Sequence, residues 1–264
     1  MPRLAEVVLL GLVQGPAELL PISSSGHVAA LPWLLRWSSY TAAPSDLKKS
    51  VEVALHAGTA VALLIGLRRE VGEAARGFDA RRLGLVAWSF GPPAVVGLAF
   101  ERAVEEKLGT PATIAAGLLA GSVLLVAADL APQERAHEDA GWVDGLCLGL
   151  AQAASLMPGV SRNGATLAAA RARRFRRADA NVLSRHSALP VIAGASALKG
   201  VRLWRAGIPP ALAGTLAAGA AASFASTLAS VRLIRLVERD HPLAWWAAYR
   251  TLAAAVILAA RRSR

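Results

Sequence analysis

Two short segments hold most of the residues that could do chemistry, and both interrupt strongly apolar sequence. The first, "QGPAELLPISSSGH", offers an amide, a carboxylate, three hydroxyl groups and an imidazole, from Gln14, Glu18, Ser23, Ser24, Ser25 and His27. Amide and carboxylate oxygens suit a metal ion, while serine and histidine can act as nucleophile or base. The flanks "LAEVVLLGLV" and "VALHAGTAVALLIGL" suit lipid, so polar groups between them indicate a buried site.

The second segment, "PGVSRNGAT", adds a positive charge. It places an arginine among small polar residues, with Gly159 and Gly164 allowing close backbone approach. An arginine at membrane depth is costly and needs a partner, either a carboxylate or an anionic ligand. The guanidinium fork fits phosphate oxygens, and small hydroxyl and amide groups fit the remaining ones. The residues concerned are Ser161, Arg162, Asn163 and Thr166. Together the two segments predict a site that processes or transports phosphate inside a membrane.

The rest of the chain has the composition of a polytopic membrane protein. Of its 264 residues, 55% are hydrophobic, more than a soluble domain of this length requires. The net charge of +11 comes mostly from arginines clustered between apolar runs, which is typical of cytoplasmic membrane loops rather than of nucleic-acid binding. The single cysteine, Cys147, excludes an intrachain disulfide. We expect one integral membrane domain over residues 1–264 and no nucleic-acid partner.

Six apolar runs are long enough, or nearly so, to cross about 30 Å of hydrocarbon as helices. They are Val51–Leu67, Leu83–Phe100, Ala112–Ala131, Ser187–Trp204, Pro209–Val231 and Leu243–Ala260. If these six runs are the crossings, Leu4–Leu35 and Gly141–Ala170 must each begin and end on the same side of the membrane. The predicted fold class is therefore an all-α polytopic membrane protein with about six transmembrane helices and two re-entrant helical hairpins.

Clusters of arginine predict the orientation. Arg68–Arg82 carries five arginines, Arg171–Arg185 carries six and Arg232–Arg239 carries three, whereas Glu101–Thr110 is more acidic than basic. The positive-inside rule places the three clusters in the cytoplasm and the acidic stretch outside. The first hairpin then enters from outside and the second from the cytoplasm.

The two polar segments also match each other. At a constant offset of 138 residues, "GLVQGPAELLPISSSGH" coincides with "GLAQAASLMPGVSRNGA" at two glycines, a leucine, a glutamine and a serine. An odd number of crossings lies between them, which indicates an inverted-topology repeat, with repeat one at about residues 1–131 and repeat two at about 141–264. In such proteins broken helices meet near the midplane and build a polar site, where protein or water surrounds the non-helical backbone.

These motifs resemble those of a known family. "QGPAELLPISSSGH" together with "PGVSRNGAT" closely resembles the two signature segments of the undecaprenyl-diphosphate phosphatases of the bacitracin-resistance type. "EVALHAGTAVALLIGLRRE", "GPPAVVGLAFE" and "YRTLAAAVILAA" extend the resemblance over nearly the whole chain. Pro16 and Ala17 replace an aliphatic–threonine pair, Asn163 stands where serine is usual, and "SRHSALP" is more polar than its phenylalanine-containing counterpart.

The resemblance implies hydrolysis of undecaprenyl diphosphate to undecaprenyl phosphate and orthophosphate. This reaction recycles the lipid carrier for peptidoglycan and other cell-wall synthesis and confers bacitracin resistance. The resemblance also implies a multi-pass protein of the bacterial inner membrane, with its active site on the extracytoplasmic side and a divalent cation, Mg²⁺ or Ca²⁺, as cofactor. A polyprenyl diphosphate lipid is the expected substrate.

Roles follow from the chemistry of the side chains. We expect Arg162 to clamp the diphosphate and Glu18 to hold the cation, with Gln14 as a second oxygen ligand. Ser24 is the candidate nucleophile and His27 its base or proton shuttle, although the histidine could itself attack phosphorus. The remaining polar residues are expected to bind substrate oxygens or backbone groups; they are Ser23, Ser25, Ser161, Asn163 and Thr166.

Two other classes of protein share part of this pattern. A lipid-phosphate transporter or flippase would also have an inverted repeat and Arg162, but transport alone does not require Glu18, Ser24 and His27. A scaffolding protein would not carry costly charges in two matched segments. His56, at the start of a predicted span, is interpreted as an interhelical hydrogen bonder rather than a ligand. A homodimer is compatible with the sequence.

Overall fold

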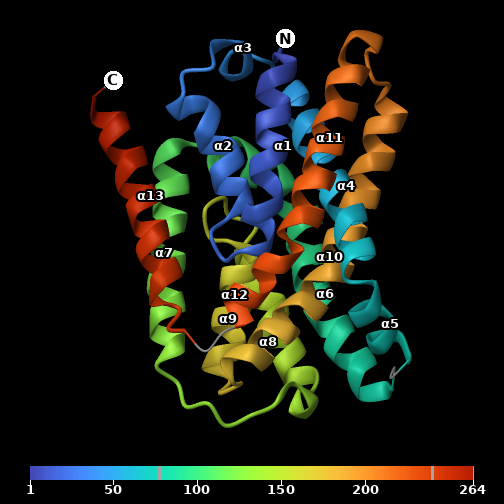
Figure 1. Cartoon of the computed structure of the whole chain (residues 1–264), viewed down its shortest axis with the longest axis vertical. Coiled ribbons are helices and arrows are strands. Elements are labelled where there is room, and N and C mark those ends of the chain that lie inside the picture. The colour runs from blue at the N-terminus through green and yellow to red at the C-terminus, as the bar shows by residue number, and fades with distance from the viewer. Residues whose placement is uncertain (77–78, 239–240, 264) are drawn as a thin grey trace.

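The computed structural model describes residues 1–76, 79–238 and 241–263, which form a helical bundle with both ends of the chain at the same end of the molecule (Figure 1). Within these residues the only β-type pairing is an isolated bridge between Arg135 and Phe175. The predicted all-α architecture is confirmed.

Long helices occupy all six predicted spans. They are α4 (Ser45–Gly66), α6 (Ala80–Lys107), α7 (Pro111–Asp129), α10 (Arg177–Ala206), α11 (Pro210–Ser230) and α13 (Ala244–Arg262). Among the described residues, four helical stretches are long and apolar enough to cross a membrane: α4, α6 as far as Phe100, α7, and the run from α11 to Val237. The helices α10 and α13 are also long enough to cross a membrane, but basic residues such as Lys199 and Arg250 lower their mean hydropathy. The protein is polytopic, and the count of six stays a prediction.

The two polar segments each fold into a broken hairpin. The first consists of α1 (Leu4–Leu19) and α2 (Ser24–Leu34), and the second of α8 (Trp142–Ala154) and α9 (Arg162–Ala172). In Figure 1 the first hairpin enters from the end that carries both termini, and the second enters from the opposite end. The bounds of α2 and α9 differ by the predicted offset of 138 residues. This geometry agrees with the inverted repeat, which stays a prediction.

Short elements connect the long ones. They are α3 (Ser38–Thr41), α5 (Arg68–Arg76), η1 (His137–Asp139), η2 (Val231–Leu233) and α12 (Ile234–Glu238). The arginine-rich segments around α5, α12 and the α9–α10 connection lie toward the end opposite the termini (Figure 1). Of the predicted arginine clusters, residues 77–78 and 239 fall outside the described part of the chain.

Each hairpin packs through glycine on a long helix from the other half of the chain. An added Cβ on Gly11 of α1 would lie 2.6 Å from the carbonyl oxygen of Gly219 in α11, and one on Gly149 of α8 would meet the carbonyl oxygen of Trp88 in α6. Small residues allow this close approach of helix backbones. Because α1 packs on α11 and α8 packs on α6, the two halves are interlocked around the centre.

Candidate active site

The turns of the two hairpins have the same local geometry. Ser23 and Ser161 precede α2 and α9 with φ values of 77° and 68°, in a region that non-glycine residues rarely occupy. Each hydroxyl accepts a hydrogen bond from the amide three residues later, at 3.2 Å from Gly26 and 3.1 Å from Gly164. Strained backbone of this kind persists where the surrounding structure holds it, often at functional sites.

Glu18 lies where the two hairpins meet. Its Oε2 accepts hydrogen bonds from the Ser24 hydroxyl at 2.6 Å and from the Gln14 amide at 3.2 Å. Its Oε1 lies 3.8 Å from Nη1 of Arg162, which comes from the second hairpin. The side chain of Glu18 is 7% exposed. A buried carboxylate therefore contacts the candidate nucleophile of one half and the candidate anion clamp of the other.

Arg162 retains hydrogen-bonding capacity at this junction. Its Nη1 is buried and has no hydrogen-bond partner among the described residues, since 3.8 Å to Glu18 is too long for a hydrogen bond. A buried donor without a partner is costly. The guanidinium of Arg162 is therefore placed to bind an anionic ligand, while the carboxylate of Glu18 lies beside it as the opposite charge.

The other predicted binders of the second hairpin mostly make contacts within the protein. Asn163 donates to the carbonyl oxygen of Leu19 at 2.8 Å and accepts from Ser184 at 3.0 Å. Thr166 shares a 2.6 Å hydrogen bond with Ser184 and donates to the carbonyl oxygen of Arg162 at 2.8 Å. These residues join α9 to α1 and α10, so they position Arg162; direct contact with substrate stays a prediction for them.

The predicted pair of Ser24 and His27 is arranged differently from expectation. The imidazole Nδ1 lies 2.7 Å from the carbonyl oxygen of Ser23, and its Nε2 lies 2.8 Å from the hydroxyl of Tyr249 in α13, whose ring stacks on it. Ser24 instead donates to Glu18. Ser25 lies 3.4 Å from the hydroxyl of Ser23. The hydrogen-bonded base nearest the candidate nucleophile is therefore a carboxylate, and the role of His27 stays a prediction.

Three residues that the sequence did not single out for the site reach it from distant helices. His56 of α4 lies 3.2 Å from the Gln14 amide, which confirms the predicted interhelical hydrogen bond but places it beside Glu18. Tyr249 holds His27. The sequence contained a signal for both residues. His56 begins "HAGTAVAL", which follows the first hairpin closely, and Tyr249 begins "YRTL", which interrupts an apolar run.

Arg250 is the third of these residues, and it connects both turns. It is fully buried, and its Nη2 donates to the carbonyl oxygens of Val160 at 2.8 Å and Gly159 at 3.2 Å in the second turn. Its Nη1 lies 3.5 Å from the carbonyl oxygen of Pro21 in the first turn. These carbonyls belong to non-helical backbone that lipid could not satisfy. Arg250 therefore stabilises the turns rather than binding substrate.

Two cavities lie on either side of the Gln14–Glu18 pair. The larger, about 470 Å³ including space open to its surroundings, contains Glu18 and Arg162 and extends along α4 and α10 toward Leu67. Its apolar wall consists of Leu19, Leu63, Leu67, Ala188, Leu189, Ile192 and Ile234. The smaller, about 250 Å³, contains Gln14 and lies toward the other end of α4, beside Ser25, Val28, Glu52, Leu55 and His56. An amphiphile with a charged head group fits this mixture of linings.

The oxygen atoms around Glu18 fit a divalent cation that also binds phosphate. Magnesium is usually held by one or two carboxylates together with substrate phosphates. Glu18 supplies a buried carboxylate, and Gln14 supplies an amide oxygen, because its hydrogen bonds to Glu18 and His56 use only the nitrogen. The donor set is incomplete without substrate oxygens, as expected of a catalytic rather than a structural cation.

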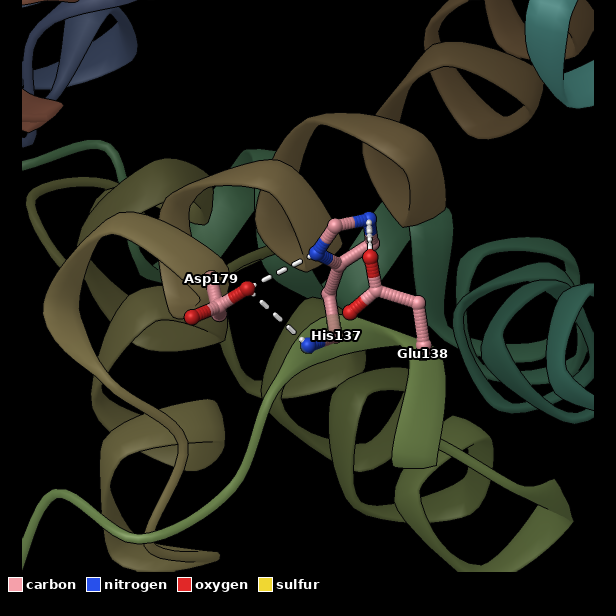
Figure 2. A group of neighbouring side chains, drawn as sticks. All are labelled: His137, Glu138 and Asp179. Carbon is pink, nitrogen blue, oxygen red and sulfur yellow. Dashed lines mark hydrogen bonds and ion pairs between the residues drawn. The ribbon is translucent and has the colours of Figure 1, made fainter.

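A second group of metal-capable side chains brings η1 and the start of α10 together (Figure 2). Ligand atoms of His137, Glu138 and Asp179 lie within 4.8 Å of one another. Asp179 binds the backbone and ring nitrogens of His137 at 3.0 and 2.7 Å, and Nε of Arg176 at 2.6 Å. Burial raises the pKa of Asp179, but the hydrogen bonds from His137 and Arg176 outweigh it and hold the pKa below its ordinary value. We interpret this group as a link between η1 and α10.

The fold and the site together define a class of protein. It is a polytopic helical membrane protein in which two broken hairpins bring a serine and a carboxylate close to an arginine. The chain belongs to the family of bacitracin resistance protein BacA, which it matches over residues 7–256. It is similar to the undecaprenyl-diphosphatase of Geobacter sulfurreducens, with 38% identity over 95% of this chain and 96% of the relative. The corresponding protein of Pelobacter propionicus is 37% identical over 97% and 96%, and that of Gemmatimonas aurantiaca is 33% identical over 98% of both.

Proposed function

We propose that the protein hydrolyses undecaprenyl diphosphate to undecaprenyl phosphate and orthophosphate, and so recycles the lipid carrier of cell-wall synthesis and confers bacitracin resistance. The observation that carries the proposal is the junction at Glu18, where Ser24 of one hairpin and Arg162 of the other contact a single buried carboxylate. Relatives of nearly equal length that are named undecaprenyl-diphosphatase support it. A transporter would not need a serine hydrogen-bonded to a carboxylate.

In the proposed reaction, Oγ of Ser24 attacks the terminal phosphorus and Glu18 takes its proton over the 2.6 Å hydrogen bond. The bridging P–O bond breaks and undecaprenyl phosphate leaves. Water then attacks the phosphoserine, orthophosphate leaves, and the proton returns from Glu18 to the serine. Arg162 stabilises the charge on the phosphoryl oxygens, since phosphoryl transfer depends chiefly on positioning and charge neutralisation. His27 positions the turn through the Ser23 carbonyl.

A divalent cation, Mg²⁺ or Ca²⁺, is part of the proposal. Glu18 and Gln14 would hold it, and when bound it would offset the negative charge of the diphosphate oxygens. The buried carboxylate and the amide oxygen left free by the hydrogen bonds of Gln14 support this assignment.

The test is phosphate release by the purified protein from farnesyl or undecaprenyl diphosphate in detergent, where transport does not occur. We expect turnover with Mg²⁺ or Ca²⁺ and its suppression by excess EDTA. Full turnover in EDTA, with no metal detected in the protein, would contradict the cation assignment. Absence of turnover under every metal condition would contradict the phosphatase.

We place the protein in the bacterial inner membrane, with the active site reached from the extracytoplasmic side. The arginine-rich end then lies in the cytoplasm, and the smaller cavity at Gln14 is lined by the part of α4 nearer the opposite end, at Glu52, Leu55 and His56. Single cysteines introduced at Arg174 and Glu105 after removal of Cys147 should react with an impermeant reagent from opposite sides. Labelling of both from one side would refute this topology. Exposed apolar residues such as Leu98, Val123 and Leu252 would contact lipid or a second copy of the chain.

A further inference from the structure

The larger cavity has a polar wall on α10 that the proposed reaction does not use. Asn181, Ser184 and Arg185 follow one another along this helix and line the same cavity as Glu18 and Arg162. Asn181 is 2% exposed, and its Nδ2 is buried without a hydrogen-bond partner in the part of the chain that is described. A buried amide donor without a hydrogen-bond partner costs free energy unless a ligand or water accepts its hydrogen bond.

The charges of this cavity favour an anion. Its lining carries two guanidinium groups, from Arg162 and Arg185, against the single carboxylate of Glu18. Arg185 has a side chain only 10% exposed and pairs with Glu70 of α5, with 3.1 Å between its Nε and Oε2. The carboxylate of Glu70 does not line the cavity. Each arginine therefore has a carboxylate beside it, and its planar fork also suits the oxygens of a phosphate in the cavity.

We propose that Asn181 and Arg185 form a phosphate subsite beside Glu18, which takes the terminal phosphate of the substrate and the orthophosphate derived from it. This inference rests on the proposed function and extends it to the α10 wall. Ser184 joins the subsite to the catalytic junction, because its hydroxyl hydrogen-bonds to both Asn163 and Thr166. Glu70 acts as the resting counter-ion of Arg185, so it competes with phosphate for the same guanidinium.

The proposal gives Arg185 and Glu70 opposite effects on phosphate affinity. Arg185→Leu should weaken binding by about tenfold or more, the low end for loss of a hydrogen bond to a charged group. Glu70→Gln should strengthen binding, because it removes a negative charge that competes with phosphate for the guanidinium. A purely structural ion pair predicts instead that both variants lose thermal stability alike and that neither changes phosphate affinity. Arg205→Leu is the matched control, since it removes a charge from the exposed end of the same helix.

The measurement is calorimetric or thermal-shift titration of the detergent-purified full chain with inorganic phosphate, repeated with farnesyl phosphate. Weaker binding of inorganic phosphate by Arg185→Leu and tighter binding by Glu70→Gln would support the subsite. The same pattern with farnesyl phosphate alone would support it as a site for lipid-linked phosphate only. Unchanged affinity for both ligands would overturn it. Binding is read without turnover, so this result is independent of whether the protein is a phosphatase.

Asn181→Leu and Asn181→Asp keep the test informative if Arg185→Leu does not fold. The first removes the buried amide donor and should weaken phosphate binding by a few-fold. The second adds a negative charge to the cavity wall and should weaken it further. Equal phosphate affinity in wild type and both variants would overturn the assignment of Asn181.

Discussion

The turns at Ser23 and Ser161 share one backbone design and carry opposite chemistry. Both begin with a serine at positive φ that accepts the amide of a glycine three residues later. At equivalent positions, however, the first hairpin has Glu18 and Ser24 where the second has Leu156 and Arg162. The same backbone geometry presents a hydroxyl in the first turn and a guanidinium in the second, and in the proposed reaction the hydroxyl attacks phosphorus and the guanidinium binds its oxygens.

The equivalent glutamines show the same division. Gln14 lies between Glu18 and His56, whereas Gln152 donates to the backbone carbonyls of Ser89 and Ser187 at 3.0 and 3.2 Å. Both side chains are buried. The first therefore contacts the proposed catalytic carboxylate and the second joins α8 to α6 and α10, although the two occupy matching positions.

The largest expected effect tests the first turn. Ser24→Ala should lower turnover by roughly 10⁴-fold or more while leaving diphosphate binding within a few-fold, because it removes the proposed nucleophile and no charge. Steady-state kinetics and substrate binding in detergent measure the two effects. Ser25→Ala is the matched control, because among the described residues the hydroxyl of Ser25 lies 3.4 Å from that of Ser23, whereas the hydrogen bond to Glu18 comes from Ser24. If Ser24→Ala stays active while His27→Ala is dead, histidine is the nucleophile.

The next effect tests the second turn. Arg162→Lys keeps the charge but loses the planar fork, and it should cost about 2–4 kcal/mol of transition-state stabilisation, the scale of one preorganised donor. This corresponds to a decrease of roughly 30- to 1000-fold in kcat/KM. Arg174→Lys, at an exposed pair with Glu134, is the control and should stay at wild-type activity. An Arg162→Lys enzyme within twofold of wild type would refute bidentate binding.

A smaller effect separates the two glutamines. Gln14→Leu should raise the Mg²⁺ concentration for half-maximal activity by about tenfold, with a smaller loss of stability than Gln152→Leu, because Glu18 keeps its hydrogen bond from Ser24. Gln152→Leu should do the reverse: it leaves two buried carbonyls without their donor and lowers the free energy of unfolding by about 1–3 kcal/mol. Metal titration of activity and thermal melting in detergent measure both variants. Matching phenotypes would mean that the division between the halves is wrong.

The smallest effect concerns the support of His27. Tyr249→Phe keeps the ring that stacks on the imidazole and removes only the 2.8 Å hydrogen bond. Loss of one neutral hydrogen bond is worth about 0.5–1.5 kcal/mol, so kcat should fall by roughly two- to tenfold. A fall beyond about 100-fold would show that proton transfer runs through this pair, and His27 would then be a base rather than a positioning residue.

The sequence predicted the hairpins because the number of crossings required Leu4–Leu35 and Gly141–Ala170 to begin and end on one side, and because both segments are rich in polar residues. The pairs α1–α2 and α8–α9 occupy these two segments. Hydrogen-bond partners within the first hairpin could not be predicted from spacing alone. Ser24 and His27 are three residues apart, which favours a pair, but the Ser23 carbonyl takes the imidazole and Glu18 takes the hydroxyl.

The position of Arg250 in α13 has a consequence for the order of assembly. Synthesis proceeds from the N-terminus, so both turns are made and inserted before this helix exists. Until α13 docks, the carbonyls of Pro21, Gly159 and Val160 lack the guanidinium that satisfies them. These carbonyls then need another hydrogen-bond donor, such as water, in place of the guanidinium. Hydrolytic competence is therefore a late event in biogenesis, and a nascent chain that stops before α13 carries every proposed catalytic residue without a fixed site.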